Sequence, residues 1–252
     1  MKNYIFLTLL PFLFQNATAQ IAEADFIPAE QGLIKIQPIL HGTVVIEWEG
    51  EVIYVDPYGG ADIFESQETP GIILITDIHG DHLNPETLDA LNTSQATFIV
   101  PQAVADQLDE KYKERLIILN NGDSTKVRNI PITALPMYNL PESPDSKHTK
   151  GRGNGYILEL GGKNVYLSGD TEDIPEMRSL KNIDVAFVCM NLPYTMDIHQ
   201  AASAVLAFKP TIVYPYHYRG KDGLSDVETF KKKVNSGNSK IEVRLRNWYP
   251  EH

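Results

Sequence analysis

The chain has 252 residues, a formal net charge of −11 and a single cysteine. Its 42% hydrophobic content is ordinary for a folded domain and excludes a disordered or collagen-like chain. The acidic balance, without a long basic run, argues against a nucleic-acid partner or an anionic membrane surface. Because one cysteine forms neither an internal disulfide nor a thiolate cluster, any metal site must use His and carboxylate ligands.

The first 19 residues have the pattern of a secretory signal peptide. Lys2 supplies a positive charge, an apolar run follows it, and Ala17-Thr18-Ala19 is a small-residue cleavage site. The apolar run is shorter than the roughly 20 residues that span a bilayer and is interrupted by Pro11, which argues against a stable membrane anchor. We therefore predict a signal peptide at 1–19 and an exported domain at 20–252, either periplasmic or secreted.

Strand patterns dominate the first half of this domain. Residues 33–39 alternate apolar and polar side chains, and residues 43–56 form two β-rich runs joined at Glu49-Gly50, which predicts an antiparallel hairpin. Residues 72–76 are an unbroken apolar run, typical of a strand buried on both faces. Asn84-Pro85 predicts the start of a helix. A strand at 97–100 and a helix at about 103–115 are predicted next.

The second half repeats the alternation of strands and helices. Strands are predicted at residues 130–135, 156–160, 165–167, 184–189 and 211–214. Helices are predicted at residues 174–180, 196–208 and 227–234, the last opened by a capping box at Ser225–Glu228. Hairpins come first in each half, which favours a single α/β domain of two facing sheets with helices outside. The polar loop between Tyr138 and Tyr156 has the length of a functional lid.

Two of the seven histidines lie in one six-residue window, Asp77-Ile78-His79-Gly80-Asp81-His82. Four N and O ligands on a tight turn, with Gly80 to allow the turn, can face two points in space, as a two-metal site requires. A solvated turn that only caps the next helix is the alternative, but a cap needs one Asp or Asn rather than two His and two Asp. The window therefore predicts a metal site after a buried strand.

This window resembles the His-x-His-x-Asp-His signature of the metallo-β-lactamase superfamily, with Asp77 in place of the first His. Residues 167–171 (LSGDT) and 214–217 (YPYH) are similar to later ligand segments of that family, in the same order. Residues 39–57 and 191–202 resemble the branch that includes the ascorbate-6-phosphate lactonase. The resemblance covers about residues 33–245 and implies a four-layer αββα metallo-β-lactamase-like sandwich.

The resemblance also implies one or two divalent ions of zinc, manganese or iron. The implied metal ligands are Asp77, His79, Asp81, His82, His148, Asp170 and His217. The family's third His has no clean equivalent, since Asn139 occupies its place by strand position while His148 lies nine residues further on. In the implied mechanism a metal-bound hydroxide attacks the substrate, and Asp81 is the catalytic residue that orients it.

We therefore expect a metal-dependent hydrolase of a small ester, lactone or related substrate. Lys147, Lys150, Arg152 and Arg219 would bind a carboxylate or phosphate if that substrate is anionic, and a solvated loop is the alternative interpretation. One competing hypothesis is a phosphodiesterase or nuclease of the same fold, against which the acidic charge counts. Another is a non-catalytic metal-binding or ligand-binding protein that kept the fold.

Four further residues have simpler interpretations. His41 and Asp56 either orient the ligand loop or serve turn chemistry. His199 lies in the first turn of a predicted helix and is interpreted as a surface residue. Cys189 lies in an apolar run and is interpreted as an inert buried thiol.

Overall fold

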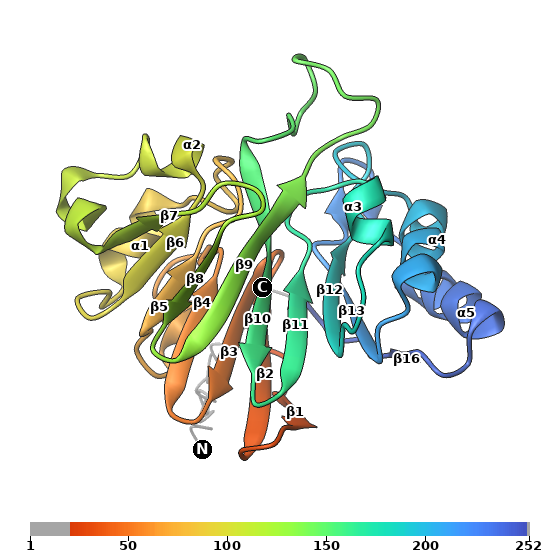
Figure 1. Ribbon diagram of the computed structural model, residues 1–252, viewed down its shortest axis with the longest axis horizontal. Helices are drawn as coiled ribbons and strands as arrows, with labels where there is room; N and C mark the ends of the chain where they lie inside the picture. The colour runs from red at the N-terminus through yellow and green to blue at the C-terminus, as the bar shows by residue number, and fades with distance from the viewer. Residues whose placement is uncertain (1–20, 251–252) are drawn as a thin grey trace, which may run out of the picture.

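The computed structural model describes residues 21–250, so the predicted signal peptide lies outside the described residues. Two seven-stranded β-sheets form the centre of the molecule (Figure 1). The first sheet contains, in spatial order, β1 (Asp25–Pro28), β2 (Leu33–Leu40), β3 (Thr43–Trp48), β4 (Glu51–Val55), β5 (Ile72–Leu74), β6 (Thr97–Val100) and β7 (Leu116–Ile118). The second contains β16 (Glu242–Val243), β13 (Ile212–Tyr216), β12 (Val185–Cys189), β11 (Lys163–Leu167), β10 (Gly153–Leu160), β9 (Ile130–Met137) and β8 (Ser124–Val127).

Both sheets change from antiparallel to parallel pairing along their width. Strands β1 to β4 pair antiparallel and β4 to β7 pair parallel. In the second sheet, β8 to β11 pair antiparallel, whereas β11, β12, β13 and β16 pair parallel. Short turns join the antiparallel strands, except for β9 and β10, which are joined by a long loop at 138–152, and helical crossovers return the chain between parallel strands. The carboxyl ends of the parallel strands consequently meet at one edge, where binding sites of such sheets form.

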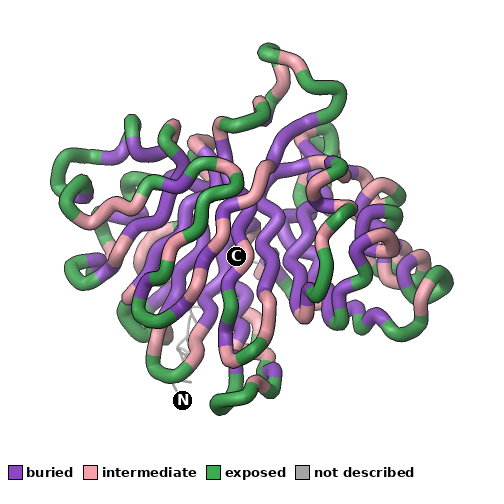
Figure 2. The backbone as a smooth tube through the Cα atoms, in the orientation of Figure 1, coloured by how far each residue is buried: buried purple, intermediate pink, exposed green. Residues whose placement is uncertain are grey.

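A continuous apolar core joins the two sheets. Ile34, Ile36 and Val44 of the first sheet belong to the same buried cluster as Leu158 and Phe187 of the second. Figure 2 shows that buried residues follow the strands, while exposed residues gather in the connecting loops. This core holds the two sheets, and therefore the loops at their common edge, in a defined relative position.

Helices cover the outer faces of both sheets. The helices are α1 (Pro85–Ala90), α2 (Gln102–Ala105), α3 (Pro175–Arg178), α4 (Ile198–Phe208) and α5 (Val227–Gly237), with 3₁₀ turns η1 (Asp62–Phe64) and η2 (Glu110–Arg115). Leu88 of α1 and Val104 of α2 pack on the first sheet, and Val205 of α4 and Phe230 of α5 pack on the core of the second. The predicted four-layer αββα fold is confirmed. No helix among residues 21–250 is long and apolar enough to cross a membrane.

Two local predictions are wrong. The predicted helix at 103–115 is divided into α2 and η2, because the Asp109 side chain accepts a hydrogen bond from the Lys111 backbone N–H (3.0 Å) and starts a new turn. Helix α5 is capped by Asp226, which accepts from the Thr229 backbone N–H (2.9 Å), rather than by Ser225. The predicted start of α1 is confirmed, since the Asn84 side chain accepts from the Thr87 N–H (2.9 Å).

Candidate metal centre

Seven predicted metal ligands come together at one edge of the sandwich. The turn after β5 carries four of them, the segments after β11 and β13 carry one each, and the loop between β9 and β10 carries the seventh. They form a first cluster, Asp77, His79 and His148, and a second cluster, His82, Asp170 and His217, each with its ligand atoms within 4.8 Å of one another. Asp81 lies beside the second cluster, near His217 and His41.

Spacings in the second cluster match those of ligands around one ion. The His82 and His217 Nε2 atoms lie 3.2 Å apart, and Asp170 oxygens lie 3.4 Å and 3.3 Å from them. Ligand atoms of a tetrahedral zinc ion, with bonds of about 2.0–2.1 Å, lie roughly 3.3 Å apart. His82, Asp170 and His217 are at most 3% exposed. The residues present therefore fit a divalent cation.

Unsatisfied polar atoms support the same conclusion. Asp170 Oδ1 and both ring nitrogens of His148 are buried without an aligned hydrogen-bond partner among the described residues. His148 Nε2 nevertheless lies 3.1 Å from an oxygen of Asp170. In a folded protein a buried polar group normally has a hydrogen-bond partner. Buried polar atoms that lie close together without forming hydrogen bonds are expected where they converge as ligands on a cation.

His82 is held in place from behind. Its Nδ1 lies 2.8 Å from Asp56 Oδ2 and 3.0 Å from Thr76 Oγ1, and Asp56 also accepts the Thr76 backbone N–H (2.7 Å). All three are buried. Burial opposes a charged imidazole, but the carboxylates of Asp170 and Asp56 raise the pKa of His82 well above its usual value. A carboxylate behind a ligand His fixes its ring orientation and leaves Nε2 for the metal.

Unusual backbone conformations occur at this edge. His41, Asp56 and His217 have left-handed φ angles of 57°, 45° and 47°, which are uncommon for residues other than glycine. His217 also donates its backbone N–H to the His41 carbonyl (3.0 Å), and a Cβ on Gly42 would lie 3.0 Å from the His217 ring. Such conformations cost about 1–3 kcal/mol each and persist where the surrounding structure imposes them, often at functional sites.

The first cluster is built differently, because its Asp77 is paired with an arginine. Arg152 Nε and Nη2 donate to the two oxygens of Asp77 at 3.0 and 2.9 Å, and His79 Nδ1 lies 2.8 Å from Oδ2. Asp77 is fully buried, yet despite the opposing effect of burial the hydrogen bond from His79 and the charge of Arg152 keep its pKa below the usual value. Arg152 thus neutralises the anion that stands where the resembled signature has an imidazole.

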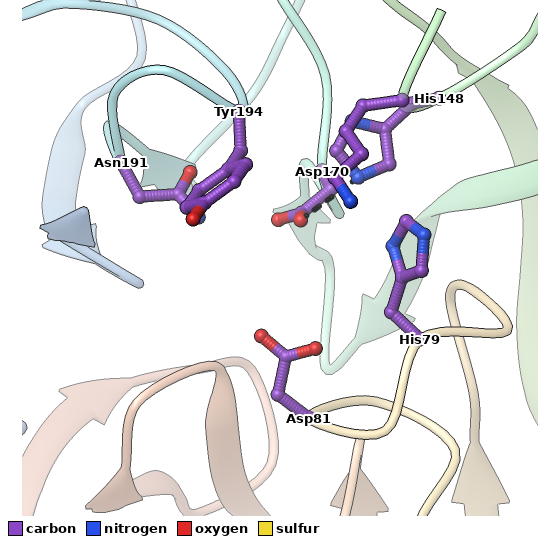
Figure 3. Close-up of a pocket in the computed structure, with 7 residues that line it drawn as sticks. His79, Asp81, His148, Asp170, Asn191 and Tyr194 are labelled. Atoms are coloured by element: carbon purple, nitrogen blue, oxygen red, sulfur yellow. Dashed lines mark ion pairs between the residues drawn. The ribbon is translucent and has the colours of Figure 1, made fainter. Parts of the chain in front are cut away.

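The structure places His148, rather than Asn139, at the first cluster. The Asn139 side chain accepts the His148 backbone N–H (2.8 Å) and donates to the Tyr194 carbonyl (2.8 Å). In return the Asn139 N–H donates to the His148 carbonyl (2.9 Å). Asn139 therefore fixes the loop, while the His148 ring lies beside Asp170 in the interior (Figure 3).

Asp81 is oriented by a hydrogen-bond chain that the sequence did not indicate. The Arg219 backbone N–H donates to Tyr249 Oη (2.8 Å), Tyr249 Oη lies 2.7 Å from His41 Nδ1, and His41 Nε2 lies 3.1 Å from Asp81 Oδ2. An ionised carboxylate only accepts hydrogen bonds, so the proton of the neutral His41 ring is assigned to Nε2, facing Asp81, and Tyr249 then donates to Nδ1. Burial lowers the pKa of His41 to about 4. Despite partial burial, hydrogen bonds to His217 and His41 keep the pKa of Asp81 far below its usual value.

A cavity of about 320 Å³ opens in front of the ligands. Its lining residues are His79, Asp81, Lys147, His148, Asp170, Asn191 and Tyr194. Figure 3 shows Asn191 and Tyr194 on the opposite side of the cavity from His79. Asn191 and Tyr194 belong to residues 191–202, which resemble the lactonase branch, but nothing in the sequence indicated a role for these two residues.

Only one of the four predicted anion-binding cations, Lys147, lines this cavity. Lys150 pairs with Glu142 and Glu176, Arg152 pairs with Asp77, and Arg219 lies over the Tyr249 ring at 4.2 Å. These three have other partners within the described chain, so the anion-binding hypothesis is left with Lys147.

Three remaining residues are located as follows. His199 is exposed on α4, as predicted. Cys189 is fully buried, and burial raises the pKa of its thiol to about 11, as expected for an inert residue. The prediction for Gly80 is wrong, because its φ is outside the left-handed region and a Cβ there would meet no atom within 4 Å.

Comparisons with known proteins agree with this geometry. The profile of a β-lactamase superfamily domain matches residues 35–217, a range that contains all seven ligands. A UPF0173 metal-dependent hydrolase from Pyrococcus furiosus is 32% identical over 215 residues, which cover 80% of this chain and 92% of the relative.

Two solved structures are similar along nearly their whole length. A protein from Parabacteroides distasonis, assigned as a metal-dependent hydrolase, is 36% identical with a TM-score of 0.79 and coverage of 89% of this chain and 98% of its own. A metallo hydrolase from Ignicoccus hospitalis is 26% identical with a TM-score of 0.73 and coverage of 87% and 96%. The profile match, the fold and the order of the ligands agree, and the chain belongs to the metallo-β-lactamase superfamily.

Proposed function

We propose that the protein is a metal-dependent hydrolase of a small ester or lactone. The observation that carries this proposal is the spacing of His82, Asp170 and His217, whose ligand atoms lie 3.2–3.4 Å apart. Asp170 also lines the cavity. Divalent ions held by such ligands supply Lewis acidity and make water a stronger acid. The names of the Pyrococcus and Ignicoccus relatives support the same class of reaction.

Asp81 is the residue that acts on the attacking water. Its side chain is one-third exposed, lines the cavity and has an oxygen 3.1 Å from His41 Nε2. The pKa of Asp81 lies far below its usual value, so its carboxylate is ionised and is suited to orient water as a hydrogen-bond acceptor. His41 and Tyr249 behind it restrict the rotation of its carboxylate.

A small ester or lactone is favoured by the size of the cavity and by the resemblance of residues 39–57 and 191–202 to the lactonase branch. A cavity of about 320 Å³ is at the lower end of the range for small-molecule sites, and the residues that line it include a single cation. A nuclease would need a longer basic surface to bind the phosphates of its substrate. The phosphodiesterase hypothesis therefore ranks second.

The proposal is tested with protein stripped by a chelator and reloaded separately with Zn²⁺, Mn²⁺ or Fe²⁺. We expect hydrolysis of 4-nitrophenyl esters or γ-lactones only after reloading, and a loss of at least about 100-fold in kcat for Asp81→Asn. Asp89→Asn is the matched control, because Asp89 is an exposed residue of α1 paired with Lys111.

Three outcomes would contradict the proposal. Full activity of the stripped protein would exclude a role for metal. Hydrolysis of bis(4-nitrophenyl) phosphate but of no ester or lactone would favour the phosphodiesterase. Binding of metal without hydrolysis of any substrate would favour a non-catalytic binding protein.

We also propose that the protein is exported after cleavage behind Ala19. The support is the order of Lys2, the apolar run and Ala17-Thr18-Ala19 in the sequence. Intact mass spectrometry of the protein from its native host should show a chain beginning at Gln20. Retention of Met1 or Lys2 would overturn this proposal.

A further inference from the structure

One wall of the cavity consists of hydrogen-bond donors. It is formed by Asn191 and Tyr194, and the exposed Lys147, whose Nζ lies 5.8 Å from the centre of the Tyr194 ring, adds a third donor. We call these three residues the donor wall, and they line the same cavity as Asp81 and Asp170. In Figure 3 Asn191 and Tyr194 lie across the open space from His79. A substrate between the two sides would meet the metal ligands on one side and the donor wall on the other.

The side-chain amide of Asn191 is fixed with its NH₂ group free. Thr195 Oγ1 accepts the Asn191 backbone N–H (3.1 Å) and donates its own proton to Asn191 Oδ1. The oxygen is thus occupied, while Nδ2 has no hydrogen-bond partner within residues 21–250. Asn191 is 2% exposed and lines the cavity. Because the oxygen is occupied and the residue lines the cavity, this NH₂ is suited to donate to a ligand there.

Tyr194 adds a second donor whose position is tied to the ligand loop. Its backbone N–H donates to the Asn191 carbonyl (2.9 Å), and its own carbonyl accepts from Asn139, which also holds His148. Within the described chain, no hydrogen bond is made by its phenolic oxygen. The tie through Asn139 keeps Tyr194 and the ligand His148 in a fixed relation across the cavity.

Lys147 adds a positive charge to the same wall. Its Nζ lies 5.8 Å from the centre of the Tyr194 ring, and within residues 21–250 no carboxylate pairs with it at 4 Å or less. The lysine three residues later, Lys150, is instead held by Glu142 at 3.0 Å and Glu176 at 3.4 Å. In a chain of net charge −11, a cation that faces a cavity without a carboxylate partner is suited to bind an anion.

We infer that the donor wall binds a carboxylate or phosphate group of the substrate, separate from the bond that is hydrolysed. An ammonium, an amide NH₂ and a phenol O–H together offer donors to an oxyanion. The acceptor oxygen of the Asn191 amide is occupied by Thr195, and the Tyr194 hydroxyl can rotate to donate. This inference rests on the proposed hydrolase function and specifies its substrates as small esters or lactones that carry an anionic group.

The test compares three esters with the same leaving group: 4-nitrophenyl butyrate, mono-4-nitrophenyl succinate and the 4-nitrophenyl ester of 3-phosphonopropionic acid. The second and third carry a terminal carboxylate and a phosphonate. We expect wild-type protein to prefer an anionic ester, and Lys147→Met to lower the ratio of kcat/KM for the anionic over the neutral ester about tenfold. Lys147→Arg should keep most of the preference, and the control Lys150→Met should keep all of it.

The same variants are compared by calorimetry in metal-loaded protein, with glutarate and inorganic phosphate as probes. Weaker binding of one probe to both Lys147→Met and Asn191→Ala, by fivefold or more, supports the inference and shows which oxyanion is recognised. An unchanged specificity ratio together with unchanged binding of both probes overturns it. Failure of wild-type protein to hydrolyse any ester counts against the hydrolase, whereas the calorimetric comparison still tests the donor wall.

Discussion

The two ligand clusters of the metal centre differ in how their geometry is maintained. All residues of the second cluster, His82, Asp170 and His217, are nearly inaccessible, and His82 rests on the buried Asp56. In the first cluster, the His79 side chain is 31% exposed and His148 lies on a long loop. A ligand side chain that is buried and hydrogen-bonded on the side away from the metal is held in its metal-binding orientation. We therefore expect the second cluster to bind its ion more tightly than the first.

The two clusters also differ in the charges around their carboxylates. The carboxylate of Asp170 faces imidazoles only, at 3.1–3.4 Å, and is available to a cation. The carboxylate of Asp77 is already paired through both oxygens with Arg152. A guanidinium at this distance opposes a further positive charge, so an ion in the first cluster binds against repulsion that the second cluster lacks.

The largest expected effect comes from removing a ligand of the second cluster. His82→Ala should reduce bound metal by at least one equivalent and lower hydrolysis by about 1,000-fold or more, because it removes a ligand and also takes one partner away from each of the buried Asp56 and Asp170. His79→Ala should keep the ion of the second cluster. Elemental analysis after dialysis measures the difference, with the exposed His199→Ala as control. Equal metal loss in the His82 and His79 variants would remove the proposed distinction.

The pair between Asp77 and Arg152 should be visible in stability. Arg152→Met leaves a fully buried carboxylate with only His79 and the more distant His148 beside it, and we expect a loss of about 3 kcal/mol in the free energy of unfolding. The double variant Asp77→Asn/Arg152→Met removes both charges and should recover most of that loss. Urea unfolding of the metal-free proteins measures both values.

A double variant no more stable than Arg152→Met alone would show that the pair does not act by charge compensation. Arg178→Met is the matched control, because Arg178 of α3 forms a partly exposed ion pair with Asp173. Such a partly solvated pair contributes about 1 kcal/mol or less.

A smaller effect is expected at the hydrogen-bond chain behind Asp81. Tyr249→Phe removes the hydroxyl that lies 2.7 Å from His41 Nδ1, so the imidazole loses the donor that fixes its tautomer. We expect kcat to fall about tenfold while the unfolding midpoint changes little. Tyr54→Phe removes a hydroxyl bonded to the Glu68 carbonyl, far from the cavity, and should leave kcat unchanged. A similar loss of kcat in both variants would argue against a specific role for Tyr249.

The smallest effect is expected at Cys189, below the second cluster. Its Sγ lies 3.4 Å from the Thr171 carbonyl, and burial raises its pKa to about 11. At pH 8 the thiolate is therefore a minor species, and the folded protein should resist labelling by a thiol reagent that labels the unfolded chain fully. Rapid labelling of the folded protein would show that the region under the second cluster opens to solvent.

Local patterns were sufficient for most of the strands and for the ligand turn. Residues 97–100 form a strand with the predicted bounds, and the hairpin at 43–56 turns at Glu49-Gly50, because period-2 alternation and a turn glycine act over a few residues. The break between α2 and η2 was missed because one hydrogen bond, from the Lys111 backbone N–H to the Asp109 side chain, outweighed a continuous helical pattern. The spacing of apolar residues along the sequence does not reveal such competition between capping and helix propagation.

The partners of the ligands could not be predicted in the same way. Arg152 is 75 residues from Asp77, and Tyr249 is 208 residues from His41. A hydrogen bond at such a separation depends on the register and packing of strands, and no local pattern encodes it.

The sequence by itself determined the fold class, the turn of four ligands and the order in which the remaining ligands follow. These are properties of short segments, whose residue types and spacing limit the conformations and the chemistry available. Only the tertiary structure decided that His148 rather than Asn139 lies at the first cluster, that Arg152 neutralises Asp77, and that Lys147 faces the cavity. Those outcomes depend on how two sheets pack their edges together, and packing joins residues that are distant in the chain.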